Sequence, residues 1–373
     1  MTKHILHVFP SFTVGGSQRR FATHVNNSSA NLRHSVLAMD GRYEAMDLIR
    51  PDRQPEQPGF TPYHERLVGA IMPYRDRLAE IAPDLLVGYN WGSVEWMLAN
   101  CLGRICPMIQ IQDGFGPDEA GGEKRLRKWV RRLAYNRAKK VVVPSHTLLE
   151  LARTSWKIAP EKLLHIPNGV DSDRFDRDTD PEMLHAFNLQ GASPIIGTVA
   201  ALRPEKNLGR LIEAFLPVAE KYDTARLVIV GDGMARAALS MLVERVGLKG
   251  RVTFTGPVST PERLIPAFDL FALSSDTEQM PLAVVEAMLA GRPVAATDVG
   301  DVARMVSEAN RPFVQGTDAA ELSGSMLRLL EDGTDRAHIG AANREKARSQ
   351  YRLDTMIEAY DRLMSDPDAV SAP

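Results

Sequence analysis

Residues 270–288 have the sequence LFALSSDTEQMPLAVVEAM, which is typical of an α/β fold. The first part, 270–275, is a short apolar run that predicts a buried strand. Pro281 suits the first position of a helix, because the missing N–H of proline costs nothing there. The stretch therefore predicts a strand, a short loop and the start of a helix.

Two carboxylates flank this predicted helix start: Glu278 in the loop and Glu286 within the helix. At a helical rise of ~1.5 Å per residue they would lie roughly 12 Å apart, too far to serve one reacting atom. They could hold hydroxyls at the two ends of an extended ligand, while the backbone amides of the helix start bind an anion between them. A nucleotide-sugar has this pattern of sugar, diphosphate and ribose.

The composition limits the classes of protein. The 373 residues suggest two or three domains, and 45 basic against 47 acidic residues argue against a general nucleic-acid binder. Two cysteines, Cys101 and Cys106, are too few for a disulfide framework and indicate a reduced, cytoplasmic setting. No run approaches the ~20 apolar residues of a membrane span, and the start of the chain resembles a strand rather than a secretory signal.

Short apolar runs alternate with helical patterns along the chain, which predicts parallel sheets wound by crossover helices. The first series of strands is expected at 5–9, 35–39, 84–88, 108–112, 140–144 and 163–166. The second is expected at 195–199, 227–230, 251–255, 270–273 and 293–296. Helices are expected between these strands, near 17–27, 64–81, 93–103, 123–139 and 147–155 in the first series and near 207–222, 235–247, 281–290, 319–331 and 335–349 in the second. We expect two doubly wound Rossmann-like domains, 1–175 and 176–350, facing each other across a cleft, and a last helix with a tail at 351–373.

Ligands of such sheets bind at the carboxyl ends of the strands, and two candidate sites lie there. Gly15 and Gly16 follow the first strand, where they either let the backbone approach a donor or form an ordinary tight turn. The adjacent Arg19 and Arg20 either meet an anion or are solvated. Gly231 opens a Gly-Asp-Gly loop, but Arg236 replaces the third glycine of a dinucleotide fingerprint, so a flexible loop is expected.

A third junction carries cations. Arg203 and Lys206 follow the first strand of the second domain, where a diphosphate would lie, and fixed cations there would stabilise its developing charge. Ordinary surface charge is the alternative. The Asp-x-Asp pairs at 171–173 and 178–180 could hold a metal, but helix caps or solvated turns are the favoured interpretation, so no metal site is expected.

A basic helical pattern covers residues 123–140. Leu126, Val130 and Leu133 share one helical face, and cations cover the rest. Either this helix contacts the inner face of an anionic membrane as a peripheral attachment, or it packs on the sheet of the first domain as a surface helix.

Taken together, these residues resemble the retaining glycosyltransferases of GT-B fold, family four (glycosyl transferases group 1). The spacing of Glu278 and Glu286 is similar to the E-x7-E motif of that family, and the similarity continues through 286–298. Residues 166–171 near the domain boundary and the last helix after Tyr351 also fit. The resemblance covers nearly the whole chain, and it implies that the last helix crosses back onto the first domain.

The resemblance implies a role for each matching residue. Glu286 would hold the donor ribose, Glu278 the sugar hydroxyls, and Arg203 with Lys206 the diphosphate, without a metal or another cofactor. The backbone after Glu278 would also contact the donor: Gln279, Met280, Pro281 and Leu282.

Three positions depart from the family pattern. Gln279 stands where the family has glycine beside the sugar, so the choice of donor sugar is open. Ala201 stands where an arginine commonly binds phosphate, and Arg203 is the expected substitute. Asp113 replaces a histidine that contacts the donor sugar, so it either accepts a sugar hydroxyl, tunes the acceptor or marks altered or lost activity.

The resemblance therefore implies a retaining hexosyltransferase (EC 2.4) that moves a sugar from a nucleoside diphosphate, by family default a UDP-sugar, to a hydroxyl. The acceptor would be a glycan, a lipid-linked molecule or a small molecule, as in polysaccharide biosynthesis, and would bind mainly to the first domain, near Gly15, Gly16, Asn90, Trp91 and Asp113. The alternatives are a non-catalytic nucleotide-sugar binder and a GT-B sugar-nucleotide epimerase. A dinucleotide oxidoreductase is disfavoured by the incomplete fingerprint at Gly231.

Overall fold

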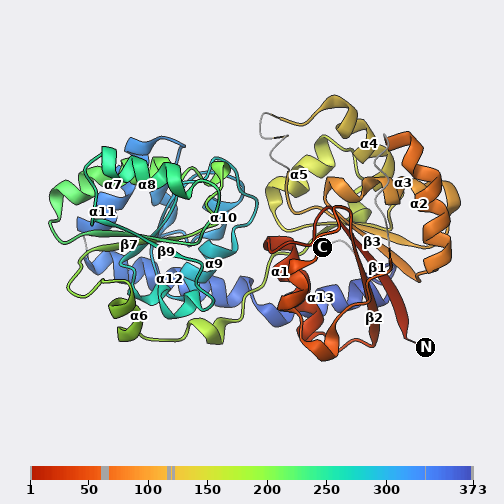
Figure 1. Cartoon of the computed structure of the whole chain (residues 1–373), viewed down its shortest axis with the longest axis horizontal. Helices are drawn as coiled ribbons and strands as arrows, with labels where there is room; N and C mark the ends of the chain where they lie inside the picture. Colours follow the sequence, from red (N-terminus) through yellow and green to blue (C-terminus); the bar gives the residue numbers. More distant parts are fainter. Residues whose placement is uncertain (1, 60–66, 116–118, 120–121, 332, 371–373) are drawn as a thin grey trace. The chain divides into compact units, whose positions relative to one another are not determined.

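The computed structural model describes residues 2–59, 67–115, 119, 122–331 and 333–370. The chain divides into two compact units, which are described separately (Figure 1). Unit 1 contains Met1–Asn168 and Asp354–Pro373, and unit 2 contains Gly169–Leu353. The sequence-based divisions fall after residues 175 and 350.

Unit 1 is built on a parallel six-stranded sheet with the strand order β2-β1-β3-β4-β5-β6. Its inner strands have buried residues on both faces, as expected for a sheet with helices on either side. All strands of the first predicted series are present: β1 (Lys3–Phe9), β2 (Leu32–Ala38), β3 (Leu85–Tyr89), β4 (Met108–Ile111), β5 (Lys140–Val143) and β6 (Leu163–His165).

The helices of unit 1 connect these strands, and α2, α3 and α4 pack side by side. The helices expected in this unit are present, including the first one near 17–27, whereas the first residues predicted for the second helix, 64–66, lie outside the described residues. The bounds are α1 (Gly16–Asn27), α2 (Leu67–Ile81), α3 (Val94–Gly103), α4 (Arg125–Tyr135) and α5 (His146–Thr154).

Helix α13 (Leu353–Ser365) belongs to unit 1, although it follows unit 2 in the sequence. The His24 ring Nε2 lies 2.7 Å from Asp361 Oδ1, and the Ser28 hydroxyl donates to the same oxygen at 2.6 Å. Burial acts to raise the pKa of Asp361, but the hydrogen bonds from His24 and Ser28 outweigh it and the pKa is lowered. These polar contacts attach α13 to α1.

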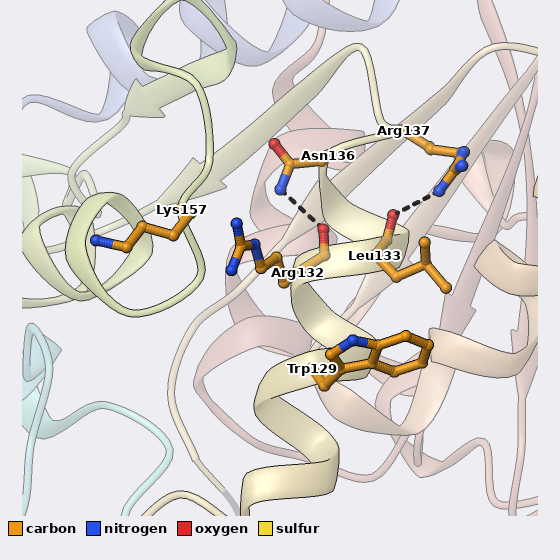
Figure 2. Close-up of a pocket in the computed structure, with 6 residues that line it drawn as sticks. All are labelled: Trp129, Arg132, Leu133, Asn136, Arg137 and Lys157. Atoms are coloured by element: carbon orange, nitrogen blue, oxygen red, sulfur yellow. Dashed lines mark hydrogen bonds between the residues drawn. The ribbon is translucent and has the colours of Figure 1, made fainter.

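The apolar residues of α4 that were expected to share one packed face differ in burial. Val130 is buried, but Leu126 is exposed and Leu133 is only half-buried. Trp129 and Leu133 project from the same side of α4 (Figure 2). The prediction that Leu126, Val130 and Leu133 form one packed face is therefore correct only for Val130, because Arg131 occupies the buried side of the helix.

Unit 2 contains a second parallel six-stranded sheet, with the order β12-β11-β10-β7-β8-β9. The five predicted strands are present, and one further strand extends the sheet at its edge. The bounds are β7 (Ile195–Val199), β8 (Arg226–Val230), β9 (Val252–Gly256), β10 (Leu270–Leu273), β11 (Val294–Thr297) and β12 (Val314–Gln315).

The helices of unit 2 include two short ones that the sequence did not predict, α6 and α10. None of the helices within the described residues is both long and apolar enough to cross a membrane. The bounds are α6 (Pro181–Ala186), α7 (Leu208–Lys221), α8 (Arg236–Arg245), α9 (Leu282–Leu289), α10 (Val302–Met305), α11 (Ala319–Glu331) and α12 (Gly333–Gln350).

Helix α9 begins one residue later than expected. Pro281 has an extended backbone (φ −69°, ψ 118°) and is the N-cap, so Leu282 is the first helical residue. The difference is small because a proline is compatible with both positions, having no N–H to lose.

The strand order indicates where each sheet is expected to bind a ligand. In unit 2 the chain starts in the middle at β7, winds outward through β8 and β9, and then returns to β10 on the other side of β7. This is the order of dinucleotide-binding domains, whose ligands bind at the reversal point. The reversal lies between β7 and β10 in unit 2, and between β1 and β3 in unit 1.

A cluster of buried histidines lies on β1 and β2 of unit 1. His7 Nε2 lies 2.9 Å from His34 Nδ1, and His4 Nε2 lies 2.7 Å from Ser35 Oγ. Burial lowers the pKa of His4, His7 and His34, in the last case to about 3. The folded state therefore holds these rings in the neutral form.

We predict that unit 1 loses stability in mild acid. Between the ordinary histidine pKa of 6.5 and about 3, the unfolded chain binds a proton at His34 that the folded chain does not. The free energy of unfolding should fall as the pH drops through this window, by up to about 1.4 kcal/mol per pH unit for each such histidine. Urea unfolding at a series of pH values measures it; His34→Gln should flatten the dependence, and the exposed control His338→Gln should not. Equal stability at neutral and mildly acidic pH would contradict the prediction.

Candidate functional site

Two loops meet at the reversal point of unit 2, one after β7 and one after β10. The backbone N–H of Asp276 donates to the carbonyl of Glu205 at 2.9 Å, and the Ser274 hydroxyl donates to the carbonyl of Lys206 at 2.9 Å. These bonds join chain segments about seventy residues apart, so each loop determines the position of the other.

Side chains at the start of α7 strengthen this junction. The Arg210 guanidinium donates to the Ser274 carbonyl at 2.8 Å and to Asp276 Oδ1 at 2.6 Å. Asn207, whose φ of 41° is left-handed, accepts from the Arg210 backbone N–H and donates to Asp276. These residues were not predicted as site residues from the sequence. The one local indication was Asn207 at the predicted helix start, because Asn is a common N-cap.

Lys206 and Glu278 form an ion pair at this junction. The Lys206 ammonium lies 2.6 Å from Glu278 Oε1, which also accepts from the Ser275 hydroxyl at 2.7 Å. The side chains are 24% and 10% exposed, so the pair is partly desolvated and better ordered than a surface ion pair. An ammonium has three donors, so Lys206 can hold Glu278 and a phosphate oxygen together. The structure thus brings together two residues that the sequence singled out separately.

Arg203 lies at the same junction but differs in environment. It is exposed and caps the short 3-10 turn Pro204–Lys206, and its side chain makes no hydrogen bond or ion pair with the described residues. Ala201 is also exposed. The loop therefore presents one cation held by Glu278 and one that can move to meet an anion.

The segment after Glu278 is held from behind by a glycine that the sequence analysis did not identify. Gly300 has a φ of +59°, and a Cβ there would lie 2.2 Å from the Glu278 carbonyl oxygen. The Asp301 backbone N–H donates to the Gln279 carbonyl at 3.0 Å. The available signal was a glycine between a strand and a helix; its role depends on a contact that only the fold creates.

The predicted donor residues that follow Glu278 lie at the start of α9 and within it. Met280 and Pro281 are buried at the start of α9, whereas Gln279, Leu282 and Glu286 are half-buried. The amide groups of the first turn of α9 are the unsatisfied donors that bind anions in related sheets. The donor assignments of these residues stay predictions.

Gly231 has a structural role in the packing of its loop. Its φ is +132°, and a Cβ would lie 2.0 Å from the Ala200 carbonyl oxygen. The Leu202 backbone N–H donates to the Asp232 carbonyl at 3.0 Å. The loop after β8 is therefore packed closely on the loop that carries Arg203, rather than being an independent flexible loop as expected.

In unit 1 the loops after β1 and β3 also touch at the reversal point. A Cβ on Gly92 would lie 2.6 Å from the Cβ of Pro10. Asn90 has a left-handed φ of 54°, and its side-chain oxygen accepts from the Asp113 backbone N–H at 2.8 Å. Gly16 has open space around a hypothetical Cβ, so this glycine is not required by packing.

Asp113 is paired with Arg20. The two groups make a bidentate ion pair, with Arg20 Nη2 lying 2.9 Å from Asp113 Oδ2. Arg20 also donates to Asn168 Oδ1 at 3.3 Å and lies over the Tyr360 ring at 5.4 Å. Burial alone would lower the pKa of Arg20, but Asp113 outweighs it and the pKa is raised. The alternative of a solvated Arg20 is therefore wrong, and the Asp113 carboxylate is held by an arginine.

Trp91 is positioned by α4. The guanidinium groups of Arg127 and Arg131 lie over its ring at 5.0 and 5.1 Å. Arg131 is itself completely buried and pairs with Glu119 at 2.7 Å and Glu123 at 2.6 Å. The acceptor-side assignments of Asn90 and Trp91 stay predictions, with their positions set by this network.

The two Asp-x-Asp pairs contain caps, in agreement with the favoured interpretation. Asp171 accepts from the Asp173 backbone N–H at 3.1 Å, and Asp180 accepts from the Glu182 backbone N–H at 2.9 Å. Asp180 also accepts from Arg263 at 2.7 Å. Both aspartates are thus engaged in the turns that they start.

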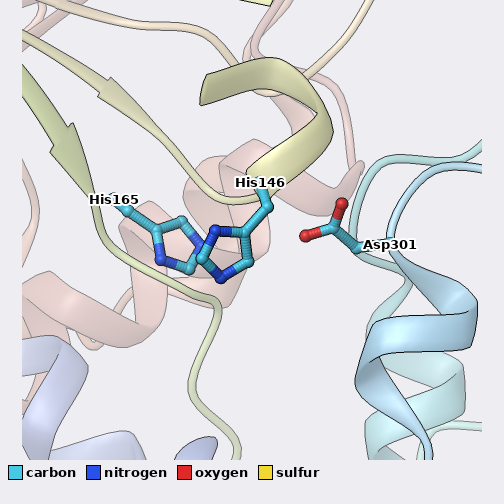
Figure 3. A group of neighbouring side chains, drawn as sticks. All are labelled: His146, His165 and Asp301. Carbon is cyan, nitrogen blue, oxygen red and sulfur yellow. The ribbon is translucent and has the colours of Figure 1, made fainter. Parts of the chain in front are cut away.

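A pair of histidines lies at the carboxyl edge of the sheet in unit 1. The rings of His146, at the start of α5, and His165, at the end of β6, have their centroids 4.2 Å apart (Figure 3). Neither histidine was predicted as a site residue, because the two are nineteen positions apart in the sequence and belong to separate elements.

Two parallel α/β units, each with its reversal point and one with a paired lysine and glutamate there, define the GT-B class of fold. The Glycosyltransferase Family 4 model matches residues 14–174, and the Glycosyl transferases group 1 model matches residues 180–346. The chain belongs to glycosyltransferase family 4.

Similar proteins carry several acceptor specificities. A GDP-mannose-dependent alpha-(1-6)-phosphatidylinositol monomannoside mannosyltransferase of Mycobacterium tuberculosis is 31% identical over 56% of this chain and 57% of its own length. An N-acetyl-alpha-D-glucosaminyl L-malate synthase of Bacillus anthracis is 23% identical over 73% of this chain and 71% of its own. The chain thus aligns with little more than half of the first of these relatives.

The fold is shared with solved structures. Anabaena HepE in complex with UDP superimposes with a TM-score of 0.81 at 21% identity, over 98% of this chain and all of that one. This likeness confirms the predicted GT-B fold.

We predict that Asp113→Ala destabilises unit 1, because it leaves the buried Arg20 charge without its partner. The free energy of unfolding should fall by about 3–5 kcal/mol, as measured by urea unfolding. The control Glu44→Ala removes an exposed partner of Arg42 and should leave the free energy of unfolding almost unchanged. Equal effects of the two variants would contradict the role given to the Arg20–Asp113 pair.

We also predict that Gly300→Ala destabilises unit 2 by at least about 1 kcal/mol, since it combines a left-handed backbone with a clash against Glu278. Gly324, in the middle of α11, has no atom near a hypothetical Cβ, so Gly324→Ala should stabilise by roughly 0.5–1 kcal/mol. Thermal unfolding of both variants checks the opposite signs, and a neutral Gly300→Ala would be inconsistent with the packing described.

Proposed function

We propose that this protein is a retaining glycosyltransferase that moves a hexose from a nucleoside-diphosphate-sugar to an acceptor hydroxyl. The observation that carries the proposal is the Lys206–Glu278 ion pair at the reversal point of unit 2, where α/β sheets bind nucleotides. Family membership and the names of the similar proteins support the same activity.

The donor would lie along the edge formed by the loops after β7 and β10. Glu286 would hold the ribose, and the first turn of α9 would receive the diphosphate with Lys206 and Arg203. Lys206 neutralises charge as the sugar–phosphate bond breaks, since fixed cations stabilise a charge that grows in the transition state. Glu278 keeps that ammonium in place and offers its second oxygen to a sugar hydroxyl.

Cations of the chain perform the task that a metal has in other phosphate sites, so we propose metal-independent transfer. The leaving diphosphate would take the acceptor proton, which requires no strong base from the protein. Asp113 fits this scheme, because its pairing with Arg20 makes it a positioning group for the loop after β4. Retention at the anomeric carbon follows from attack on the face that the diphosphate leaves.

The acceptor would bind to unit 1 near Gly15, Gly16, Asn90, Trp91 and Asp113. A glycan or lipid-linked acceptor suits the resemblance to the phosphatidylinositol monomannoside mannosyltransferase, and a UDP-sugar donor suits the likeness to the UDP-bound structure. Peripheral attachment to a membrane through residues 123–140 would bring a lipid-linked acceptor to the enzyme.

The test combines binding and turnover with a panel of UDP-, GDP- and ADP-hexoses. A donor at about 100 times its Kd should stabilise the protein by about 2.7 kcal/mol in thermal unfolding. With the donor found in this way, Lys206→Met should lower kcat/KM by on the order of a hundredfold or more, because one transition-state cation is lost. The control Lys249→Met removes the exposed partner of Glu244 and should leave kcat/KM unchanged.

The other outcomes separate the alternatives. Binding without transfer or donor hydrolysis would indicate a non-catalytic nucleotide-sugar binder, and conversion of the donor without an acceptor would indicate an epimerase. Full activity of a folded Lys206→Met variant would show that the proposed donor site is wrong.

A further inference from the structure

Helix α4 exposes large apolar side chains on the side that faces away from unit 1. Its inner side is closed by Val130, Arg131, Ala134 and Tyr135, all buried. Trp129 on the outer side is 61% exposed. Most of this side chain is in water and contributes little to the packing of unit 1, so its neighbours on the same side decide whether it belongs to an apolar patch.

The exposed apolar side chains follow one another along the helix. Leu126, which is 73% exposed, Trp129 and Leu133 are spaced by three and four residues, so they form a continuous stripe, called here the α4 stripe. A hollow of about 370 Å³ lies beside it (Figure 2). Its lining combines the stripe with cations: Trp129, Arg132, Leu133, Asn136, Arg137 and Lys157.

Exposed cations flank the α4 stripe. Arg125, Lys128 and Arg132 lie on the outer side of α4, and none of them makes an ion pair with the described residues. The nearby carboxylates Glu119 and Glu123 are directed inward and pair with Arg131. Their negative charge therefore does not balance the outer side, although the whole chain has a formal net charge of only −2.

Exposed apolar side chains flanked by cations fit the surface of an anionic lipid bilayer, which offers both an apolar layer and phosphates. Tryptophan and leucine enter the boundary between headgroups and acyl chains, while arginine and lysine remain at the phosphates. The 11 residues of α4 span about 16 Å at 1.5 Å per residue, about half of a bilayer core, so the helix can only lie along the surface. Each cation near an anionic membrane adds to the attraction.

We propose that unit 1 docks on an anionic phospholipid bilayer through the outer side of α4. Trp129 and Leu126 enter the headgroup layer, and Arg125, Lys128 and Arg132 bind lipid phosphates. This docking rests on the proposed function, because it assigns residues and a lipid class to the membrane attachment proposed there. None of these residues belongs to the donor or acceptor sites, so loss of vesicle binding and loss of sugar transfer are separate results.

The experiment is sedimentation of the full-length protein with vesicles of phosphatidylcholine alone or with added phosphatidylglycerol. Wild-type protein should bind only the mixed vesicles, and added salt should weaken the binding because surface charges are screened. Leu126→Ser/Trp129→Ser and, separately, Arg125→Glu/Lys128→Glu/Arg132→Glu should each weaken binding at least tenfold. Each side chain is exposed, so both variants should keep the thermal unfolding midpoint of the wild type.

A matched control lies on α8 of unit 2, which also exposes a large apolar residue and a cation. Met241 is 66% exposed, and Arg245 is exposed four residues later. Met241→Ser/Arg245→Glu should bind vesicles as the wild type does.

Three results would overturn the proposal. The first is a wild-type protein that stays in solution with the mixed vesicles at low salt. The second is equal binding by the wild type and both α4 variants. The third is tighter binding to a second copy of the chain or to RNA than to vesicles, lost in the same α4 variants, which would assign the α4 stripe to a different partner.

Discussion

The contact between Lys206 and Glu278 depends on two loops that leave neighbouring parallel strands at the same edge. Parallel pairing of β7 and β10 brings the carboxyl ends of these strands together. The Asp276 N–H bond to the Glu205 carbonyl and the Ser274 hydroxyl bond to the Lys206 carbonyl then join the two loops. This arrangement places the Lys206 ammonium 2.6 Å from the Glu278 carboxylate. The start of α9 belongs to the loop after β10, and Gly300, in the loop after β11, packs against Glu278 of that loop.

Unit 1 uses the same type of edge with a different pair of charges. Arg20 comes from the helix after β1 and Asp113 from the loop after β4, and their ion pair is nearly enclosed. Helix α13 adds Tyr360 over the guanidinium and Asp361 at His24, so the last helix of the chain supports the first. The environment of Asp113 is thus decided by segments from both ends of the sequence.

Much of the fold was predictable because buried strands and long helices have local signals. Apolar runs and helical periodicity located every strand except β12, whose two residues are too few for any pattern. The short helices α6 and α10 were missed for the same reason. In the site, the positions of Lys206 and Glu278 were anticipated, but their mutual ion pair was not, since 72 residues separate them.

Local pattern was thus sufficient for the strand–loop–helix junctions and for the two glutamates of the segment 270–288, because each depends on residues close in sequence. Packing between distant segments decided the rest. It buried Arg20 against Asp113 and left Trp129 in solvent. It also brought backbone atoms so close to Gly231 and Gly300 that a side chain would clash at either position. A side chain's partner and its exposure depend on which distant surfaces meet it, and the periodicity of one helix contains no information about those surfaces.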